Sequence, residues 1–365
     1  MKYKIFTAYK IFTAAFLLLC ILPSAGMLFL PPTEAAANER LTPVPQLKSE
    51  DGSWNQNVLD DATNYIADHF ALRQEMVTAN AMLQTGLLAT SPAEDVIYGT
   101  DGWLYYAETL DDYQNRATLT DEEVQQIAQT IADMQAYCEA RGAQFVFTIA
   151  PNKNSLYPEH MPSRYLQSDS PGNYEKLKPL LEEYGVHYAD LFTFLSEQDE
   201  ILYLKTDSHW TNRGAALAHD FLMETLGLPH TAFAQAEYTT AETHRGDLYE
   251  MLYPKGTARE AQQAYETTFS YVSEPRTAED ILIQTTSPDA PNGRLLLCRD
   301  SFGNALHPFL AEDFREATIT RQMPYPLEQV QAGDTVIVEI VERNLANLLK
   351  YPPNFGNQTQ TDSVE

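Results

Sequence analysis

Residues 293–304 read GRLLLCRDSFGN, an apolar run that ends in a polar turn. Residues 294–298 have the length and composition of a buried β-strand, and residues 303–314 are predicted to form a helix directly after the turn. A strand that passes at once into a helix is typical of α/β proteins, in which helices connect parallel strands. This stretch therefore predicts an α/β fold.

The alternation of apolar runs and helical segments continues on both sides of this stretch. Thr120 and Glu123 form a capping box that predicts a helix to about Arg141, closed by Gly142, before a strand at 144–150. We also expect a hairpin at 98–105, strands near 187–191 and 335–341, a strand or strand-like turn at 201–204, strand-like runs at 268–272 and 281–284, and helices at about 174–184 and 212–226. Parallel strands joined by helices are covered on both faces. The predicted fold is therefore a doubly wound parallel sheet flanked by helices.

Composition excludes several classes of protein. Hydrophobic residues make up 44% of the 365 residues, which is enough to build a core and argues against a disordered chain. Lys and Arg number 24 against 51 Asp and Glu, and a net charge of -27 argues against nucleic-acid binding. The three cysteines, Cys20, Cys138 and Cys298, form no metal-binding or disulfide pattern. We expect Cys138 and Cys298 to be buried free thiols.

The N-terminus is predicted to carry an export signal. Lys2, Lys4 and Lys10 flank an apolar run at 11–30, which fits a membrane anchor, and the small residues at 35–37 also fit a signal-peptide cleavage site. Under either reading, the rest of the chain faces away from the cytoplasm. The predicted organisation is a signal peptide or anchor at 1–37, a helical stalk or cap at 38–94, a catalytic domain at 95–350 and a flexible tail at 351–365.

Two polar turns at predicted strand ends contain residues suited to catalysis. Ser301 lies on the turn between strand and helix, where backbone N–H groups could hold an oxyanion, although Asp300 or Ser301 could equally be a helix cap. A nucleophilic serine needs a base, and that base needs an orienting partner. Asp207 and His209, two residues apart, could supply both, or could be metal ligands. The chain has no HExxH motif or histidine cluster, so we expect no metal and no cofactor.

The turn at 207–210, DSHW, resembles the signature of the DHHW proteins of Gram-positive bacteria. These proteins are relatives of the alginate O-acetylation proteins, which have an SGNH-hydrolase-like domain. Serine replaces the first histidine of the signature, at a position that is not part of the family's triad. Four more stretches agree in the family's order: NERL at 38–41, GTDGWL at 99–104, APNKNSLYPE at 150–159 and DSFGN at 300–304.

The resemblance implies roles for individual residues. It makes Ser301 the nucleophile, His209 the general base and Asp207 the carboxylate that orients His209. No GxND block is visible, so the family's oxyanion asparagine has no clear counterpart. From their places near predicted strand ends, and not from the resemblance, we expect these residues at the substrate or the oxyanion: Asn152, Lys153, Arg299, Asn304 and Arg343. Asn152 and Lys153 could instead belong to a solvated loop, and Trp210 is either a site residue or a core aromatic under the turn.

The resemblance also implies a function. We expect an extracytoplasmic O-acetyltransferase that modifies an exported polysaccharide through an acetyl-serine, with a membrane-bound O-acyltransferase as the source of acetyl groups. With water in place of the sugar hydroxyl, the same residues would make a carbohydrate acetyl esterase. A non-catalytic polysaccharide-binding or assembly protein is the remaining alternative.

Overall fold

The computed structural model describes residues 2–30, 40–49, 51–116, 118–353 and 355. The chain divides into two compact units. Unit 1 comprises Met1–Ile97 and Asp247–Ala258, and unit 2 comprises Tyr98–Gly246 and Arg259–Glu365. The small residues at 35–37, the first two residues of the NERL stretch and most of the predicted tail lie outside the described residues. The division predicted from sequence, with its stalk, catalytic domain and tail, stays a prediction.

Unit 2 is built on a seven-stranded sheet. Its strand order is β4 (Tyr188–Ala189), β3 (Gln144–Ala150), β11 (Thr335–Val341), β9 (Asn292–Cys298), β10 (Phe314–Thr320), β8 (Leu282–Thr286) and β7 (Ser270–Tyr271). The strands from β4 to β10 are parallel, but β8 and β7 are antiparallel to their neighbours. The prediction of an entirely parallel sheet is therefore wrong at this edge. The loop from β8 to β9 is too short for the helical crossover that parallel strands need.

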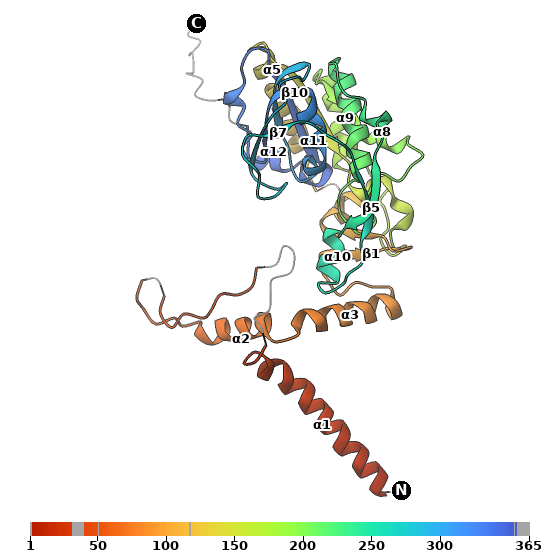
Figure 1. Cartoon of the computed structure of the whole chain (residues 1–365), viewed down its shortest axis with the longest axis vertical. Helices are drawn as coiled ribbons and strands as arrows, with labels where there is room; N and C mark the ends of the chain where they lie inside the picture. The colour runs from red at the N-terminus through yellow and green to blue at the C-terminus, as the bar shows by residue number, and fades with distance from the viewer. Residues whose placement is uncertain (1, 31–39, 50, 117, 354, 356–365) are drawn as a thin grey trace. The chain divides into compact units, whose positions relative to one another are not determined.

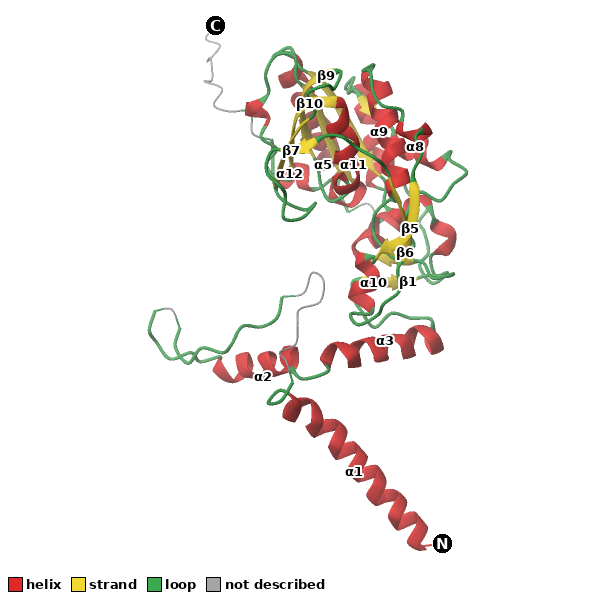
Figure 2. Cartoon of the chain, viewed as in Figure 1, coloured by secondary structure: helices red, strands yellow, loops and turns green. Residues whose placement is uncertain are grey.

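Helices cover both faces of the sheet (Figure 1, Figure 2). Successive residues of a strand point to opposite faces. Leu295 and Leu297 accordingly pack in one core cluster with residues of α9 (Asn212–Leu226) and α11 (Gly303–Asp313). Leu296 and Cys298 pack in the other with residues of α5 (Asp121–Glu139) and α7 (Asn173–Glu183). Each fully buried leucine contributes about 1.5–3 kcal/mol. The doubly wound arrangement follows from central strands that carry buried apolar residues on both faces.

The other elements of unit 2 surround this sheet. The helices are α4 (Leu110–Tyr113), α5 (Asp121–Glu139), α6 (Lys153–Leu156), α7 (Asn173–Glu183), α8 (Leu191–Ser196), α9 (Asn212–Leu226), α11 (Gly303–Asp313) and α12 (Asn347–Lys350), and β2 (Leu104–Tyr106), β5 (Thr239–His244) and β6 (Glu260–Ala264) are the remaining strands. Short 3₁₀ helices occupy Ala107–Thr109, Pro158–His160, Phe233–Gln235, Leu327–Gln329 and Glu342–Asn344. The capping box of α5 is present, with both Thr120 and Glu123 bonded as predicted.

Several regions refine or differ from the sequence-based expectations. At 201–204, where a strand or a strand-like turn was expected, a single bridge joins Tyr203 to Trp210 and the chain turns back at once. β10 and the antiparallel pair β5–β6 were not predicted. The side chains of β5 are mostly exposed, so it has no apolar alternation that could have revealed it.

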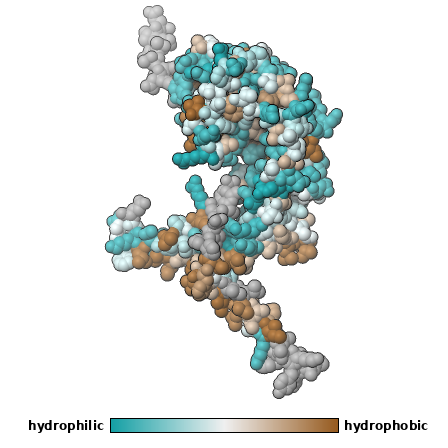
Figure 3. Space-filling model, viewed as in Figure 1, coloured by the Kyte–Doolittle hydropathy of each residue, from teal (hydrophilic) through white to brown (hydrophobic). Residues whose placement is uncertain are grey.

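Unit 1 is helical. It contains α1 (Lys2–Gly26), α2 (Val58–His69), α3 (Arg73–Leu88) and α10 (Asp247–Leu252), and β1 (Val96–Tyr98) begins within it. The segment around α10 is bonded to α3, because the Tyr253 hydroxyl donates to Thr85 Oγ1 at 2.8 Å and the Lys255 N–H donates to Thr78 Oγ1 at 3.0 Å. Large apolar side chains of α1, α2 and α3 are exposed and appear in brown in Figure 3. No helix in the described part of the chain is long and apolar enough to cross a membrane.

Candidate active site

Ser301 lies on the turn that connects β9 to α11, at the carboxyl edge of the sheet. The carboxylate of Asp300 fixes this turn, because its oxygens accept hydrogen bonds from the backbone N–H groups of Phe302 at 2.9 Å and Val341 at 2.7 Å. Phe302 is the N-cap of α11, without a side-chain capping bond. The Ser301 hydroxyl instead lies 2.8 Å from Nε2 of His209.

His209 lies on the turn before α9 and is held by Asp207. Oδ1 of Asp207 accepts hydrogen bonds from the backbone N–H of His209 at 2.9 Å and from its Nδ1 at 2.7 Å. With the proton on Nδ1, Nε2 is left to accept the proton of Ser301. The structure therefore brings together all three residues that the sequence predicted as a triad.

Asp207 has a second imidazole partner, which the sequence did not reveal. Its Oδ2 lies 2.8 Å from Nε2 of His244, the last residue of β5. Burial by itself would raise the pKa of Asp207, but the hydrogen bonds from His209 and His244 outweigh it and hold that pKa well below its usual range. His244 belongs to no motif, and its strand carries no apolar pattern, so no signal in the sequence singled it out.

Buried side chains fix the turn that carries His209. The Lys153 ammonium donates to the carbonyl oxygens of Leu204, Lys205 and Asp207 at 3.0, 3.0 and 2.5 Å. Lys153 is only 4% exposed, and its ammonium also lies 5.6 Å from the centre of the Trp103 ring and 5.2 Å from that of Tyr105. The role of Lys153 at the substrate or oxyanion stays a prediction.

Trp210 joins the turn that carries His209 to the turn that carries Ser301. It is buried, and its indole N–H donates to the carbonyl oxygen of Phe302 at 3.1 Å, so the residue after His209 is bonded to the residue after Ser301. The rings of Trp210 and Phe302 also meet edge to face, 5.1 Å apart. These contacts agree with the expectation of a core aromatic under the turn.

The structure places Arg299 and Asn304 beside each other. Arg299 is 2% exposed and donates to Asn304 Oδ1, to the Asp300 carbonyl at 3.0 Å and to the Ala278 carbonyl at 2.7 Å. Burial lowers the pKa of Arg299 to about 10. The amide nitrogen of Asn304 donates to Glu279 at 3.3 Å. These contacts hold the Ser301 turn, and a contact of either residue with substrate stays a prediction.

Asn152 and Arg343 lie at the ends of two other strands of the same edge. Asn152 is fully buried, and its amide nitrogen donates to Asp112 at 3.0 Å. The guanidinium of Arg343 is half-buried, with its carbon 5.7 Å from the centre of the Phe302 ring and 5.5 Å from that of Tyr106. Arg343 thus lies near the residue that follows Ser301. The oxyanion role of Asn152 and the substrate contact of Arg343 stay predictions.

Several carboxyl groups with raised pKa values lie near this edge of the sheet. Burial, together with the neighbouring charge of Asp112, raises the pKa of Glu342 to about 8, and burial raises that of Asp112 to about 6. Glu342 accepts hydrogen bonds from the Asn152 N–H at 2.9 Å and from the Ser155 hydroxyl at 2.8 Å. Glu339 on β11 is fully buried, and burial raises its pKa well above the usual range.

Asp207, His209 and His244 are of the residue types that bind transition metals. In this structure, however, each oxygen of Asp207 accepts a hydrogen bond from an imidazole N–H. The three side chains therefore form a hydrogen-bonded network in which each imidazole contacts one oxygen of Asp207.

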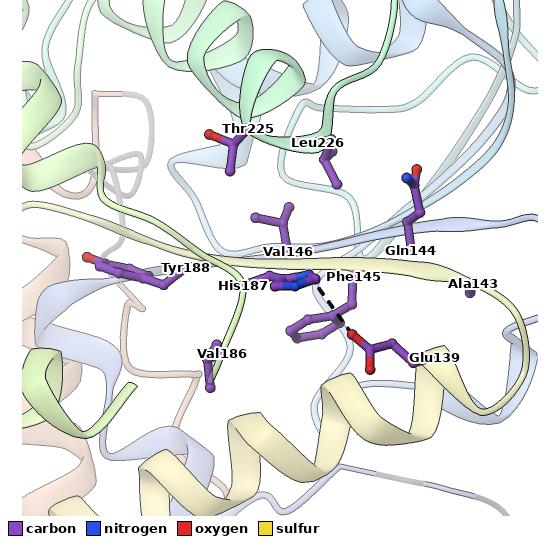
Figure 4. Close-up of a pocket in the computed structure, with 10 residues that line it drawn as sticks. All are labelled: Glu139, Ala143, Gln144, Phe145, Val146, Val186, His187, Tyr188, Thr225 and Leu226. Carbon is purple, nitrogen blue, oxygen red and sulfur yellow. Dashed lines mark ion pairs between the residues drawn. The ribbon is translucent and has the colours of Figure 1, made fainter. Parts of the chain in front are cut away.

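A cavity of about 500 Å³ lies at the opposite edge of the sheet (Figure 4). It is lined by residues at the start of β3 and β4 and at the end of α9, among them Gln144, Tyr188 and Leu226. His187 and Glu139 face each other there at 4.0 Å. None of the predicted site residues lines this cavity, so it is separate from the Ser301 site.

A doubly wound α/β unit with serine, histidine and aspartate meeting at the carboxyl edge of its sheet has the architecture of SGNH-hydrolase-like proteins. The family profile described as "SGNH hydrolase-like domain, acetyltransferase AlgX" matches residues 96–317, more than half of the chain. The chain belongs to this family.

Sequence relatives agree with this assignment. The protein called "Probable alginate O-acetylase AlgJ" from Pseudomonas fluorescens is 29% identical over 163 residues, which are 42% of this chain and 40% of that protein. The protein of the same name from Pseudomonas syringae pv. tomato is 30% identical over 162 residues, with the same coverage. The chain thus matches about two fifths of the length of these relatives.

Solved structures share the fold. A DHHW family protein from Eubacterium siraeum is 14% identical with a TM-score of 0.50, covering 71% of this chain and 99% of that one. Bacillus cereus PatB1, solved with a sulfonyl adduct, is 18% identical with a TM-score of 0.52, covering 68% and 97%. The predicted resemblance to the DHHW and alginate O-acetylation proteins is confirmed.

Proposed function

We propose that the protein is an O-acetyltransferase that modifies an exported polysaccharide through an acetyl-serine intermediate on Ser301. The observation that carries the proposal is the hydrogen bond of 2.8 Å between Nε2 of His209 and Oγ of Ser301, with Nδ1 of the same imidazole held by Asp207. The family's description and the names of the curated relatives, which are acetyltransferases and alginate O-acetylases, support the choice of acetyl transfer.

In the first half of the reaction, Ser301 takes the acetyl group from a donor ester. Nε2 of His209 accepts the hydroxyl proton while Oγ forms a bond to the acetyl carbon. The tetrahedral intermediate then collapses, the bond to the donor oxygen breaks, and the imidazolium of His209 returns its proton to that oxygen. Asp207 stabilises the imidazolium and keeps its ring in position.

In the second half, the acetyl group leaves Ser301. His209 accepts the proton of an incoming hydroxyl group, whose oxygen attacks the acetyl carbon, and Ser301 departs with the proton that His209 returns. A sugar hydroxyl gives an acetylated polysaccharide, whereas water gives acetate and an esterase. Exclusion of water and positioning of the sugar hydroxyl decide between these products.

The proposal places the protein outside the cytoplasm. The lysines and apolar run at residues 2–30 support export, and a retained first segment would bring the N-terminus to the membrane. Because acetyl-CoA is cytoplasmic, a membrane-bound O-acyltransferase is the proposed source of acetyl groups, and the acceptor is the polysaccharide.

The proposal is tested with a chromogenic acetyl ester, with and without an oligosaccharide acceptor. Wild-type protein should release the chromophore, and Ser301→Ala and His209→Ala should abolish release while both variants keep the wild-type circular dichroism spectrum. Acetylated oligosaccharide identifies a transferase, and acetate alone identifies an esterase. Absence of Ser301-dependent release, together with absence of labelling by a sulfonyl fluoride, would favour the non-catalytic binding protein.

A further inference from the structure

We propose that His244 is a positioning residue of the Ser301 site. It holds Oδ2 of Asp207 so that Oδ1 of the same carboxylate stays aligned with His209. This inference rests on the proposed function. It adds a fourth residue to the three that the sequence indicated, and that residue comes from a different element, the end of β5.

The hydrogen bonds around Asp207 define what His244 does. Oδ1 accepts the two bonds from His209, at 2.9 and 2.7 Å, and Oδ2 accepts the bond from Nε2 of His244 at 2.8 Å. An ionised carboxylate can only accept hydrogen bonds, so Nε2 of His244 is the donor. The carboxyl group of Asp207 is thereby fixed at both oxygens and cannot rotate about its Cβ–Cγ bond without breaking a charge-assisted bond.

The backbone places His244 where it can act in this way. β5 and β6 form an antiparallel pair in which His244 lies opposite Glu260. Glu260 accepts hydrogen bonds from the backbone N–H of Lys205 at 2.7 Å and of Thr206 at 2.8 Å. One end of the hairpin therefore contacts the turn just before Asp207 and Asp207 itself.

The same hairpin also holds the segment after His209. The backbone N–H of Asn212 donates to Gln262 at 2.9 Å, and its side-chain amide donates to the Gln263 carbonyl at 2.7 Å. The hairpin therefore holds the catalytic turn through contacts on both sides of His209. The side chain of His244 is 30% exposed, so packing in the core does not explain its place there.

The test compares three variants in the chromogenic ester assay. His244→Leu removes the donor and should lower kcat about 10- to 100-fold, the range typical when a partner that orients a reactive group is removed, with KM within about twofold. His244→Gln keeps an N–H donor at a similar reach and should recover most of kcat. His187→Leu is the matched control, because His187 is an exposed histidine of the same unit, and its kinetics should equal those of wild type.

A double-mutant cycle shows whether His244 acts through Asp207. In an Asp207→Asn background, His244→Leu should cause no further loss of kcat, because the charged acceptor is already gone. Equal and independent losses in both backgrounds would overturn the proposal, as would wild-type kcat in His244→Leu. If wild type itself shows no Ser301-dependent turnover, the proposed function fails, which is a different result.

A spectroscopic measurement covers the case in which His244→Leu is unstable. The proton between Nδ1 of His209 and Asp207 should give a low-field resonance in the proton NMR spectrum of wild type. That resonance should shift in His244→Gln, because a weaker donor to Oδ2 changes the basicity of the Asp207 carboxylate, and stay in place in His187→Leu. An unchanged resonance in His244→Gln would contradict the proposal.

Discussion

Replacing Glu342 by glutamine tests the buried carboxyl groups at the carboxyl edge of the sheet, near the Ser301 site. Glu342 is 7% exposed, and burial raises its pKa from 4.5 to about 8. Between these two values the folded protein keeps a proton that the unfolded chain has lost, so stability falls as pH rises. Each pH unit within this window costs about 1.4 kcal/mol. Between about pH 6 and about pH 8, the titration of Glu342 should therefore lower the unfolding free energy of the wild type by on the order of 2 kcal/mol.

Glutamine resembles the protonated acid, and its oxygen can still accept from Asn152 and Ser155. The free energy of unfolding of Glu342→Gln, measured in urea from about pH 6 to about pH 8, should lack this loss. The difference in unfolding free energy between the variant and wild type should therefore change by roughly 2 kcal/mol over that range. Glu328→Gln, at an exposed position, is the matched control. Its unfolding free energy should change with pH in parallel with that of wild type. Parallel curves for wild type and Glu342→Gln would refute the assignment of a buried, protonated Glu342.

Three further predictions concern the packing around Ser301. Trp210→Phe leaves the buried carbonyl oxygen of Phe302 without its indole donor, and should cost about 1–3 kcal/mol in urea unfolding together with a lower kcat; unchanged values of both would contradict the link between the two turns. Gly303→Ala places a methyl group 2.7 Å from Cβ of buried Arg299, so thermal unfolding should show a lower Tm, and an unchanged Tm would contradict the close approach. Burial raises the pKa of the Cys298 thiol, so a thiol reagent should leave it unmodified until urea unfolds the protein; rapid labelling of the native protein would contradict its burial.

Local sequence signals predicted much of the fold. The helix expected at 212–226 has those bounds as α9, and Thr120 and Glu123 cap α5 as expected, because capping and amphipathic periodicity act within a few residues. Cys138 and Cys298 are buried free thiols, as predicted. β10 was missed because it starts directly after α11 without a turn, and because Arg315 and Glu316 at its start are exposed.

The candidate site was predictable only where a motif marked it. Asp207 and His209 stand two residues apart, and Ser301 follows an apolar strand, so each could be named from the sequence. His244 could not, because it reaches Asp207 through strand pairing that depends on the whole hairpin. The contacts of Lys153 were also beyond the sequence, since a buried ammonium that holds three carbonyl groups is defined only by the folded turn.

Mass spectrometry of the acetylated protein tests the central claim most directly. The protein is incubated briefly with an activated acetyl ester, quenched in acid and digested, and the peptide that contains Ser301 is examined. The account predicts one added acetyl group on Ser301 in wild type and none on this peptide in Ser301→Ala or, over the same short time, in His209→Ala. An acetyl group that never appears on Ser301, or that forms as fast in His209→Ala as in wild type, would contradict it.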